Sequence, residues 1–206
     1  MIAQPHSLFD FGPLAAEYER WYHTPAGRSH DGYQKALVQR ILSPAGPRER
    51  LLEIGCGTGN WSRFFALLGY TVLGVDISKS MIEVAKAHPS PQCRFEVADA
   101  CNLPFASDTF EVVAAMATLE FVSDGPGALA EMFRCTSPSG RILIGTLNRL
   151  APMNQRRVAE GKEPYASARL YSPDELRELL EQYGHVQINV TAEASIGALI
   201  VAEVRP

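Results

Sequence analysis

The stretch LLEIGCGTGN, residues 51–60, constrains the fold more than any other part of the sequence. Its first four residues resemble the end of a buried strand, and three glycines follow at alternate positions. Apolar residues resume at Trp61 and Phe64 with the spacing of a helix. A strand that enters a glycine-rich turn before a helix lets a ligand approach the backbone closely and points the helix N-terminus at it.

The spacing of these glycines argues against a pyrophosphate ligand. The dinucleotide fingerprint has glycine at its first, third and sixth positions, whereas here the fifth position from Gly55 is Gly59 and the sixth is Asn60. A P-loop would end in Lys followed by Ser or Thr, and Asn60-Trp61 supplies neither. The loop is therefore predicted to hold a ligand without a bridging phosphate.

Strand-like and helix-like segments alternate along the chain, which is typical of a parallel sheet with helices on both faces. Five short apolar segments are predicted as strands: residues 51–54, 71–76, 94–98, 112–116 and 142–147. Helices are predicted between them at residues 61–68, 78–87 and 128–135. Two last strands, 186–191 and 198–204, are close enough in sequence to pair antiparallel at one edge of the sheet.

Two further segments are expected to cover the sheet. Residues 14–23 and 33–42 are predicted as helices joined by the linker TPAGRSHDG, and they form an N-terminal helical cover over about residues 8–45. Residues 148–170 contain no convincing strand and are too long for a simple connection, so they are a candidate lid. Since 46% of the residues are apolar and can bury one core, we expect a single domain over residues 1–206.

Composition narrows the partners. The formal net charge is −4 without a long run of one sign, so the chain lacks the basic footprint of a dedicated nucleic-acid binder. We see neither a signal peptide nor a membrane span, and expect a cytoplasmic protein, monomer or homodimer, that acts on a small molecule. The cysteines lack the paired spacing of a zinc site, so inert thiols and no metal are expected.

Acidic residues close the next two predicted strands. Asp76 lies about twenty residues beyond the glycine loop, where a carboxylate can accept hydrogen bonds from both hydroxyls of a ribose. Asp99 closes the following strand. Either residue alone could equally be a helix cap or turn former. Because the carboxyl ends of parallel strands meet at one edge of the sheet, the two acids and the loop together indicate a ligand site there.

Together these motifs resemble a class I S-adenosylmethionine-dependent methyltransferase, of the broad group related to the ubiquinone and menaquinone biosynthesis enzymes. The resemblance covers about residues 51–147 and rests on LLEIGCGTG, VLGVDIS, VADACNLPF with DTFEVV, and LAEMFRCTSPSGRILIG. It implies an α/β, Rossmann-like, doubly wound sheet of seven strands, mostly parallel, with an antiparallel last strand. The family commonly has Pro-Gly-Gly where this chain has Pro138-Ser139-Gly140, and Gly140 is expected to keep the turn by a positive φ.

The resemblance also implies roles for single residues on the methionine side of the cofactor. Glu53 and the backbone around Gly55 and Gly57 would hold the methionine portion of S-adenosylmethionine. Met116 and Ala117, just past the fourth strand, would line the cofactor beside the methionine chain. S-adenosylhomocysteine would be the product.

On the nucleoside side, the resemblance implies that Asp76 binds the ribose hydroxyls and Ile77 packs on the adenine. Asp99 would accept a hydrogen bond from the adenine amino group, and Ala100 would offer its backbone N–H to a ring nitrogen. Further cofactor contacts are expected at Cys56, Met81 and Tyr22.

Methyl transfer from a sulfonium is a direct displacement, so alignment and exclusion of water can suffice and a base is optional. Four residues are candidates for a base or an acceptor contact, and each has an ordinary alternative. Glu120 could instead be a solvated acid and His23, like His30, a surface histidine. Tyr165 and Tyr171, at the end of the lid, could simply pack it down.

The acceptor and the activity stay open at this level. Aromatic residues in the two cover segments, such as Tyr18 and Trp21, suggest an apolar or aromatic acceptor. Arg156, Arg157 and Lys162 could bind an anionic group or form the solvated face of a short helix. A non-catalytic S-adenosylmethionine-binding sensor or partner protein would keep every cofactor residue, whereas a nicotinamide-dependent dehydrogenase is disfavoured by the loop spacing.

Overall fold

The computed structural model describes residues 6–47, 49–191 and 197–206. Its centre is a seven-stranded sheet with the order β3-β2-β1-β4-β5-β7-β6. The strands are β1 Arg50–Ile54, β2 Thr71–Asp76, β3 Cys93–Val97, β4 Phe110–Met116, β5 Thr136–Leu147, β6 His185–Val190 and β7 Leu199–Arg205. The first five run parallel, and β7 is antiparallel to both β5 and β6. The predicted Rossmann-like sheet with an antiparallel last strand is confirmed.

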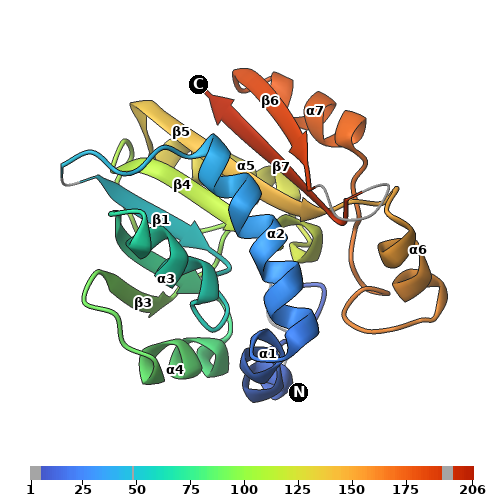
Figure 1. Ribbon diagram of the computed structural model, residues 1–206. Coiled ribbons are helices and arrows are strands. Elements are labelled where there is room, and N and C mark those ends of the chain that lie inside the picture. Colours follow the sequence, from blue (N-terminus) through green and yellow to red (C-terminus); the bar gives the residue numbers. More distant parts are fainter. Residues whose placement is uncertain (1–5, 48, 192–196) are drawn as a thin grey trace.

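Helices cover both faces of this sheet. They are α1 Ala15–Tyr22, α2 Pro25–Ile41, α3 Asn60–Leu67, α4 Lys79–Ala87, α5 Gly125–Cys135, α6 Pro152–Ala159 and α7 Pro173–Glu181, with short 3-10 turns at Gly12–Leu14 (η1) and Leu119–Phe121 (η2). In Figure 1, α2 and α3 lie in front of the sheet, whereas α5 lies behind it.

Alternate residues of the strands supply the two layers of the core. Leu51 of β1 packs with Val38 of α2 and Phe65 of α3, while its neighbour Leu52 packs on the opposite face with Leu129 of α5. All of these side chains are buried. Each fully buried side chain of this kind contributes about 1.5–3 kcal/mol, so the two layers hold the edge of the sheet that carries the glycine loop rigidly in place.

The linker predicted between the first two helices is wrong, because α2 already begins at Pro25. The Thr24 hydroxyl accepts a hydrogen bond from Gly27 N–H at 3.0 Å, and proline follows at the first helical position, where its missing N–H costs nothing. Together the cap and the proline start the helix, and the glycines that suggested a loop lie inside it.

The turn predicted at Gly140 is also different from the structure. β5 begins at Thr136 and runs through the Pro138-Ser139-Gly140 segment, with an irregular register against β4. Gly140 is not among the residues with positive φ. A Cβ atom there would lie 2.9 Å from the carbonyl oxygen of Glu111, so glycine is needed for close approach of two strands rather than for a left-handed turn.

Of the two cover segments, α1 and the segment with α6 lie at the carboxyl ends of the parallel strands, whereas α2 crosses the front face of the sheet. The arrows of β1 and β5 point towards the side of the molecule that holds α1 and α6 (Figure 1). The excursion after β5 returns to its start, because Arg149 N–H donates to Tyr171 C=O at 2.8 Å. Within the described ranges, no helix is long and apolar enough to cross a membrane.

Candidate functional site

A cavity of about 820 Å³, which includes space open to solvent, lies at the carboxyl ends of β1, β2, β3 and β4. The N-terminal segment and α1 form its outer wall, through His6, Phe11 and Tyr18 among others. The residues that the sequence predicts as cofactor contacts line this first cavity with the exception of Glu53: Tyr22, Gly55, Cys56, Gly57, Asp76, Ile77, Met81, Asp99, Ala100, Met116 and Ala117.

The glycine loop has a backbone that other residues rarely adopt. Gly55, Gly57 and Gly59 have φ values of +67°, +53° and +82°. A Cβ atom on Gly55 would overlap the side chain of Thr118, and one on Gly59 would lie 2.7 Å from Phe95 Cζ. Glycine is therefore required at positions 55 and 59 for two reasons: the left-handed backbone and the close approach of neighbouring segments.

Asp76 connects the end of β2 to this loop. Its Oδ2 accepts a hydrogen bond from Gly57 N–H and its Oδ1 one from Ser78 N–H, both at 2.8 Å. Burial raises the pKa of the carboxyl group, while the two backbone hydrogen bonds lower it. Each carboxylate oxygen has a further lone pair that can accept from a ligand in the cavity.

Asp99 has a partner that sequence reasoning missed. His6 Nδ1 lies 2.7 Å from Asp99 Oδ2, and the hydrogen bond raises the pKa of the imidazole. The other oxygen, Oδ1, accepts from Cys101 N–H at 2.9 Å. The segment that carries His6 is held against the end of the sheet, because Leu8 N–H donates to Phe121 C=O at 2.8 Å. No local motif around His6 predicts this contact.

The cysteines add little to the site. All four, Cys56, Cys93, Cys101 and Cys135, are free thiols. The potential ligand atoms of His6, Asp99 and Cys101 lie within 4.8 Å of one another, and His6 and Asp99 are hydrogen-bonded to each other. Burial raises the pKa of the Cys56 thiol well above its ordinary value, which keeps this loop residue protonated and unreactive.

Glu53 lies behind the glycine loop rather than on the cavity wall. It is 1% exposed, and its Oε2 accepts a hydrogen bond from the Ser62 hydroxyl of α3. Burial raises the pKa of this carboxyl group to about 8. Glu53 therefore connects β1 to α3 through Ser62. It does not line the cavity in which its predicted ligand contact would lie.

Ala117 marks the place where the loop, β4 and β5 converge. It has a φ of +52°, which is rare for a residue other than glycine, and its N–H donates to Gly145 C=O at 2.7 Å. Such strain is of the order of 1 kcal/mol and is concentrated at functional sites. Sequence alone predicts the position of Ala117 after the strand but not this backbone conformation.

A second cavity of about 870 Å³, again with open space included, adjoins the first. The two share a wall formed by Phe11, Tyr18, Tyr22, Trp61, Ala117 and Phe121. Its far side is formed by residues of α2, α6 and the loop after α6, including His30, Gln34, Arg157 and Tyr165. In the shared wall, Tyr22 O–H donates to Tyr18 Oη at 3.2 Å. Burial raises the pKa of Tyr18 to about 12, so the phenol stays neutral.

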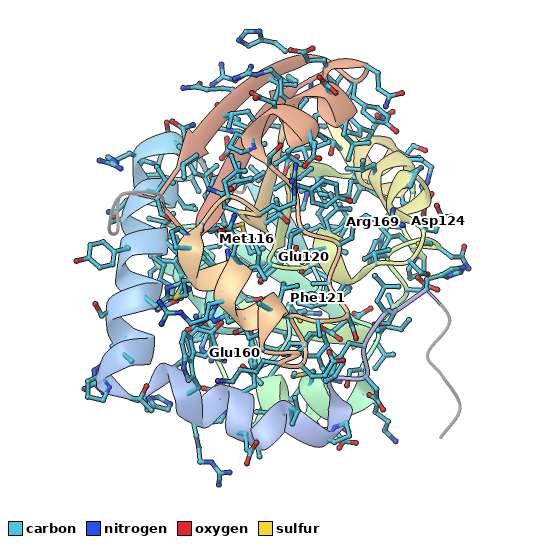
Figure 2. All side chains as sticks on the ribbon, turned by 90° about the vertical axis from the view of Figure 1, so that its right-hand side faces the viewer. Met116, Glu120, Phe121, Asp124, Glu160 and Arg169 are labelled. Atoms are coloured by element: carbon cyan, nitrogen blue, oxygen red, sulfur yellow. The ribbon has the colours of Figure 1, made fainter. Side chains whose placement is uncertain are left out.

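The predicted catalytic candidates are scattered. Tyr165 lines the second cavity, whereas Tyr171 lines neither cavity and His23 is 73% exposed at the surface. Glu120 is fully buried, so the alternative that it is a solvated acid is wrong. Its carboxylate accepts from Thr146 Oγ1 at 3.1 Å and from Leu147 N–H at 3.0 Å. Figure 2 shows it deep inside the molecule near Phe121, where it joins η2 to β5.

Replacing Glu120 by Gln is expected to remove part of the pH dependence of stability. Burial raises the pKa of Glu120 from 4.5 to about 7, so the folded chain keeps a proton that the unfolded chain releases. Stability therefore falls as pH rises through this window and then levels off. From about pH 4.5 to about pH 8, the free energy of unfolding of Glu120→Gln should rise relative to wild type by about 3 kcal/mol. Urea unfolding at each pH measures this difference, and a difference that does not change with pH would contradict the buried carboxyl.

The chain has clear similarity to known proteins. Residues 52–144 match a family model described as a methyltransferase domain. An O-methyltransferase of Penicillium expansum is 33% identical over 156 residues, which cover 73% of this chain and 56% of that protein. A demethylmenaquinone methyltransferase of Renibacterium salmoninarum is 37% identical over 98 residues, 48% of this chain and 41% of that one. The chain spans about half the length of these curated relatives.

Solved structures share the whole architecture. A methyltransferase from Thermotoga maritima, described as S-adenosylmethionine-dependent and as a possible histamine N-methyltransferase, has a TM-score of 0.73 at 27% identity, with 95% of this chain and 98% of that one covered. Magnesium protoporphyrin IX methyltransferase from Synechocystis has a TM-score of 0.74 over 95% of this chain and 96% of that one. Since its identity is only 16%, this second likeness shows the fold alone.

Proposed function

We propose that the chain is an S-adenosylmethionine-dependent methyltransferase that transfers a methyl group to a small-molecule acceptor, a proposal that its similarity to methyltransferases supports. The observation that carries the proposal is the pair of adjoining cavities with a common wall. A displacement reaction needs donor and acceptor atoms about 3–3.5 Å apart before reaction. Because six residues line both cavities, a ligand in one would lie beside a ligand in the other.

The chemistry of the first cavity suits this cofactor. The cavity contains the carboxylates of Asp76 and Asp99, and among the described residues no lysine or arginine lines it. Such a surface favours a ligand with a sulfonium and an amino group and disfavours a phosphate. Asp76 would accept hydrogen bonds from the ribose hydroxyls, and Asp99 one from the adenine amino group. Ile77 and Met81 would provide apolar contacts to the adenine, and Ala100 would offer its backbone N–H to a ring nitrogen.

The methionine end would lie along the glycine loop, near Met116 and Ala117. The bound cofactor supplies a methyl group on a cationic sulfur, which is already a good leaving group. The role of the chain is then to align the acceptor and exclude water. Tyr18, Tyr22 and Phe121 in the shared wall are suited to both tasks, because they are large and apolar and the two tyrosines stay neutral.

The two cover segments complete the proposal. We propose one methyltransferase domain over residues 1–206, in which residues 8–45 form a helical cover and residues 148–170 form a lid. Both segments contribute to the second cavity, through α1 and α2 on one side and Arg157, Pro164 and Tyr165 on the other. A lid at this place would separate the reacting atoms from bulk water.

Incubation with methyl-labelled S-adenosylmethionine and fractionated metabolite extracts tests the activity. We expect label to appear in at least one small-molecule fraction, and the transfer to fall at least about tenfold in Tyr18→Ala, which opens the shared wall. Asp174→Ala, on the exposed side of α7, is the matched control and should transfer label like wild type. Absence of transfer to every fraction, with cofactor binding intact, would support a sensor or partner protein instead.

A further inference from the structure

The second cavity has aromatic walls and one arginine side chain among its described lining residues. Its apolar lining includes Leu14 and Trp21 of the helical cover, Trp61 of α3 and Leu147 at the end of β5. Among the described lining residues, Arg157 is the one arginine and no lysine is present. A ligand of this cavity therefore meets flat apolar surfaces on most sides and a permanent positive charge at one place.

Two contacts hold the guanidinium group of Arg157 in position. The group stacks over the ring of Tyr165, 4.3 Å from the ring centroid. Nη1 donates a long hydrogen bond of 3.4 Å to Asn154 Oδ1. Asn154 is itself fully buried and donates to the carbonyl oxygens of Asn148 at 3.0 Å and Ala198 at 2.9 Å. α6 is therefore anchored to the sheet by the residue that Arg157 contacts.

The charge of Arg157 has no acidic partner in the part of the chain that the structure describes. Its side-chain hydrogen bond goes to the amide oxygen of Asn154, and its ring contact is to Tyr165. The nearest acid along the helix, Glu160, lies at the end of α6 (Figure 2) and forms no ion pair with it. A guanidinium that is half-buried beside an apolar cavity keeps several N–H donors for an anionic group, which it can bind through two parallel hydrogen bonds.

Neighbouring cations do not share this arrangement. Arg156 and Lys162 are exposed and line neither cavity. Of the three cations that the sequence leaves undecided between anion binding and a solvated face, the structure brings one to the cavity and leaves two in solvent. Arg156 is thus a control of the same residue type, one position away on the same helix.

We propose that the second cavity takes an aromatic acceptor that carries an anionic group, and that Arg157 is the specificity-determining residue that binds this group. The inference rests on the proposed function, since it names the class of acceptor for the same site. The aromatic part would lie against the shared wall beside Tyr18 and Phe121, and the anionic group would lie at the far side under the lid.

Two fluorescent probes with the same rings test this directly. Anilinonaphthalenesulfonate carries a sulfonate, and N-phenylnaphthylamine lacks it. In titrations of the full chain, Arg157→Gln should weaken binding of the sulfonate probe about tenfold and leave the neutral probe within about twofold. Arg156→Gln should leave both affinities unchanged. Arg157→Lys should give an intermediate value, because it keeps the charge without the planar fork.

Two outcomes would overturn the inference. If Arg157→Gln weakens both probes equally, Arg157 maintains the shape of the cavity and does not bind an anion. If the sulfonate probe binds wild type, Arg156→Gln and Arg157→Gln alike, the anionic group lies elsewhere. Titration of each variant with S-adenosylhomocysteine reports separately on the proposed function. Because Arg157 lies outside the first cavity, cofactor affinity should be the same in wild type and in all three variants.

Discussion

Asp76→Ala is expected to lower the affinity for S-adenosylhomocysteine by at least about a hundredfold. The substitution removes the carboxylate proposed to bind two ribose hydroxyls, and hydrogen bonds to a charged group are worth about 1.5–3 kcal/mol each. It also leaves the N–H groups of Gly57 and Ser78 without their acceptor, so the glycine loop loses one of its hydrogen bonds to β2. Isothermal titration calorimetry of the variant and of wild type measures the effect.

Two matched variants separate the ligand contact from damage to the fold. Asp76→Asn keeps one oxygen acceptor for the loop and should bind with an intermediate affinity. Asp174→Ala removes an exposed carboxylate on α7 and should bind like wild type. Unchanged affinity in Asp76→Ala, with a thermal unfolding curve that confirms a folded protein, would show that the ribose assignment is wrong.

Gly55→Ala should destabilise the protein by about 3 kcal/mol and abolish cofactor binding. A left-handed backbone costs a residue with a Cβ about 1 kcal/mol. The new methyl group would also overlap Thr118, whose own Cβ lies only 2.8 Å from the position it needs. The loop or Thr118 must move to remove this overlap, and overpacking of this kind costs roughly a further 1–3 kcal/mol. Urea unfolding gives the change in free energy.

Gly161→Ala is a control for the backbone cost alone. Gly161 has a φ of +61°, and a Cβ atom there would have nothing within 4 Å. The Gly161→Ala variant should therefore lose only about 1 kcal/mol in free energy of unfolding and keep its affinity for S-adenosylhomocysteine. Equal losses in Gly55→Ala and Gly161→Ala would mean that the contact with Thr118 is not what makes glycine necessary at position 55.

The sheet and most of the first cavity were predictable because their signals are local. A glycine loop directly follows a buried strand, and Asp76 and Asp99 come at the ends of the next two strands. Parallel topology brings the ends of such strands to one edge whatever the rest of the chain does. The start of α2 is not predicted, because Gly27 and Gly32 suggest a loop where the Thr24 cap and Pro25 begin the helix.

The remaining features depend on contacts between distant parts of the chain. His6 and Asp99 are 93 residues apart, and nothing in either local sequence connects them. The position of Arg157 depends on Asn154, which binds the backbone at Ala198 across the end of the sheet. Glutamate is usually exposed, so the sequence does not predict that Glu120 is buried. Hydrogen bonds from Thr146 and Leu147 to its carboxyl group stabilise it in the interior.

The most direct test of the central claim is a pair of calorimetric titrations of the wild-type chain, one with S-adenosylhomocysteine and one with NADH. The first cavity, with its two carboxylates and its glycine spacing, predicts binding of S-adenosylhomocysteine with a stoichiometry near one and no binding of NADH. Binding of NADH without binding of S-adenosylhomocysteine would contradict the assignment of the site.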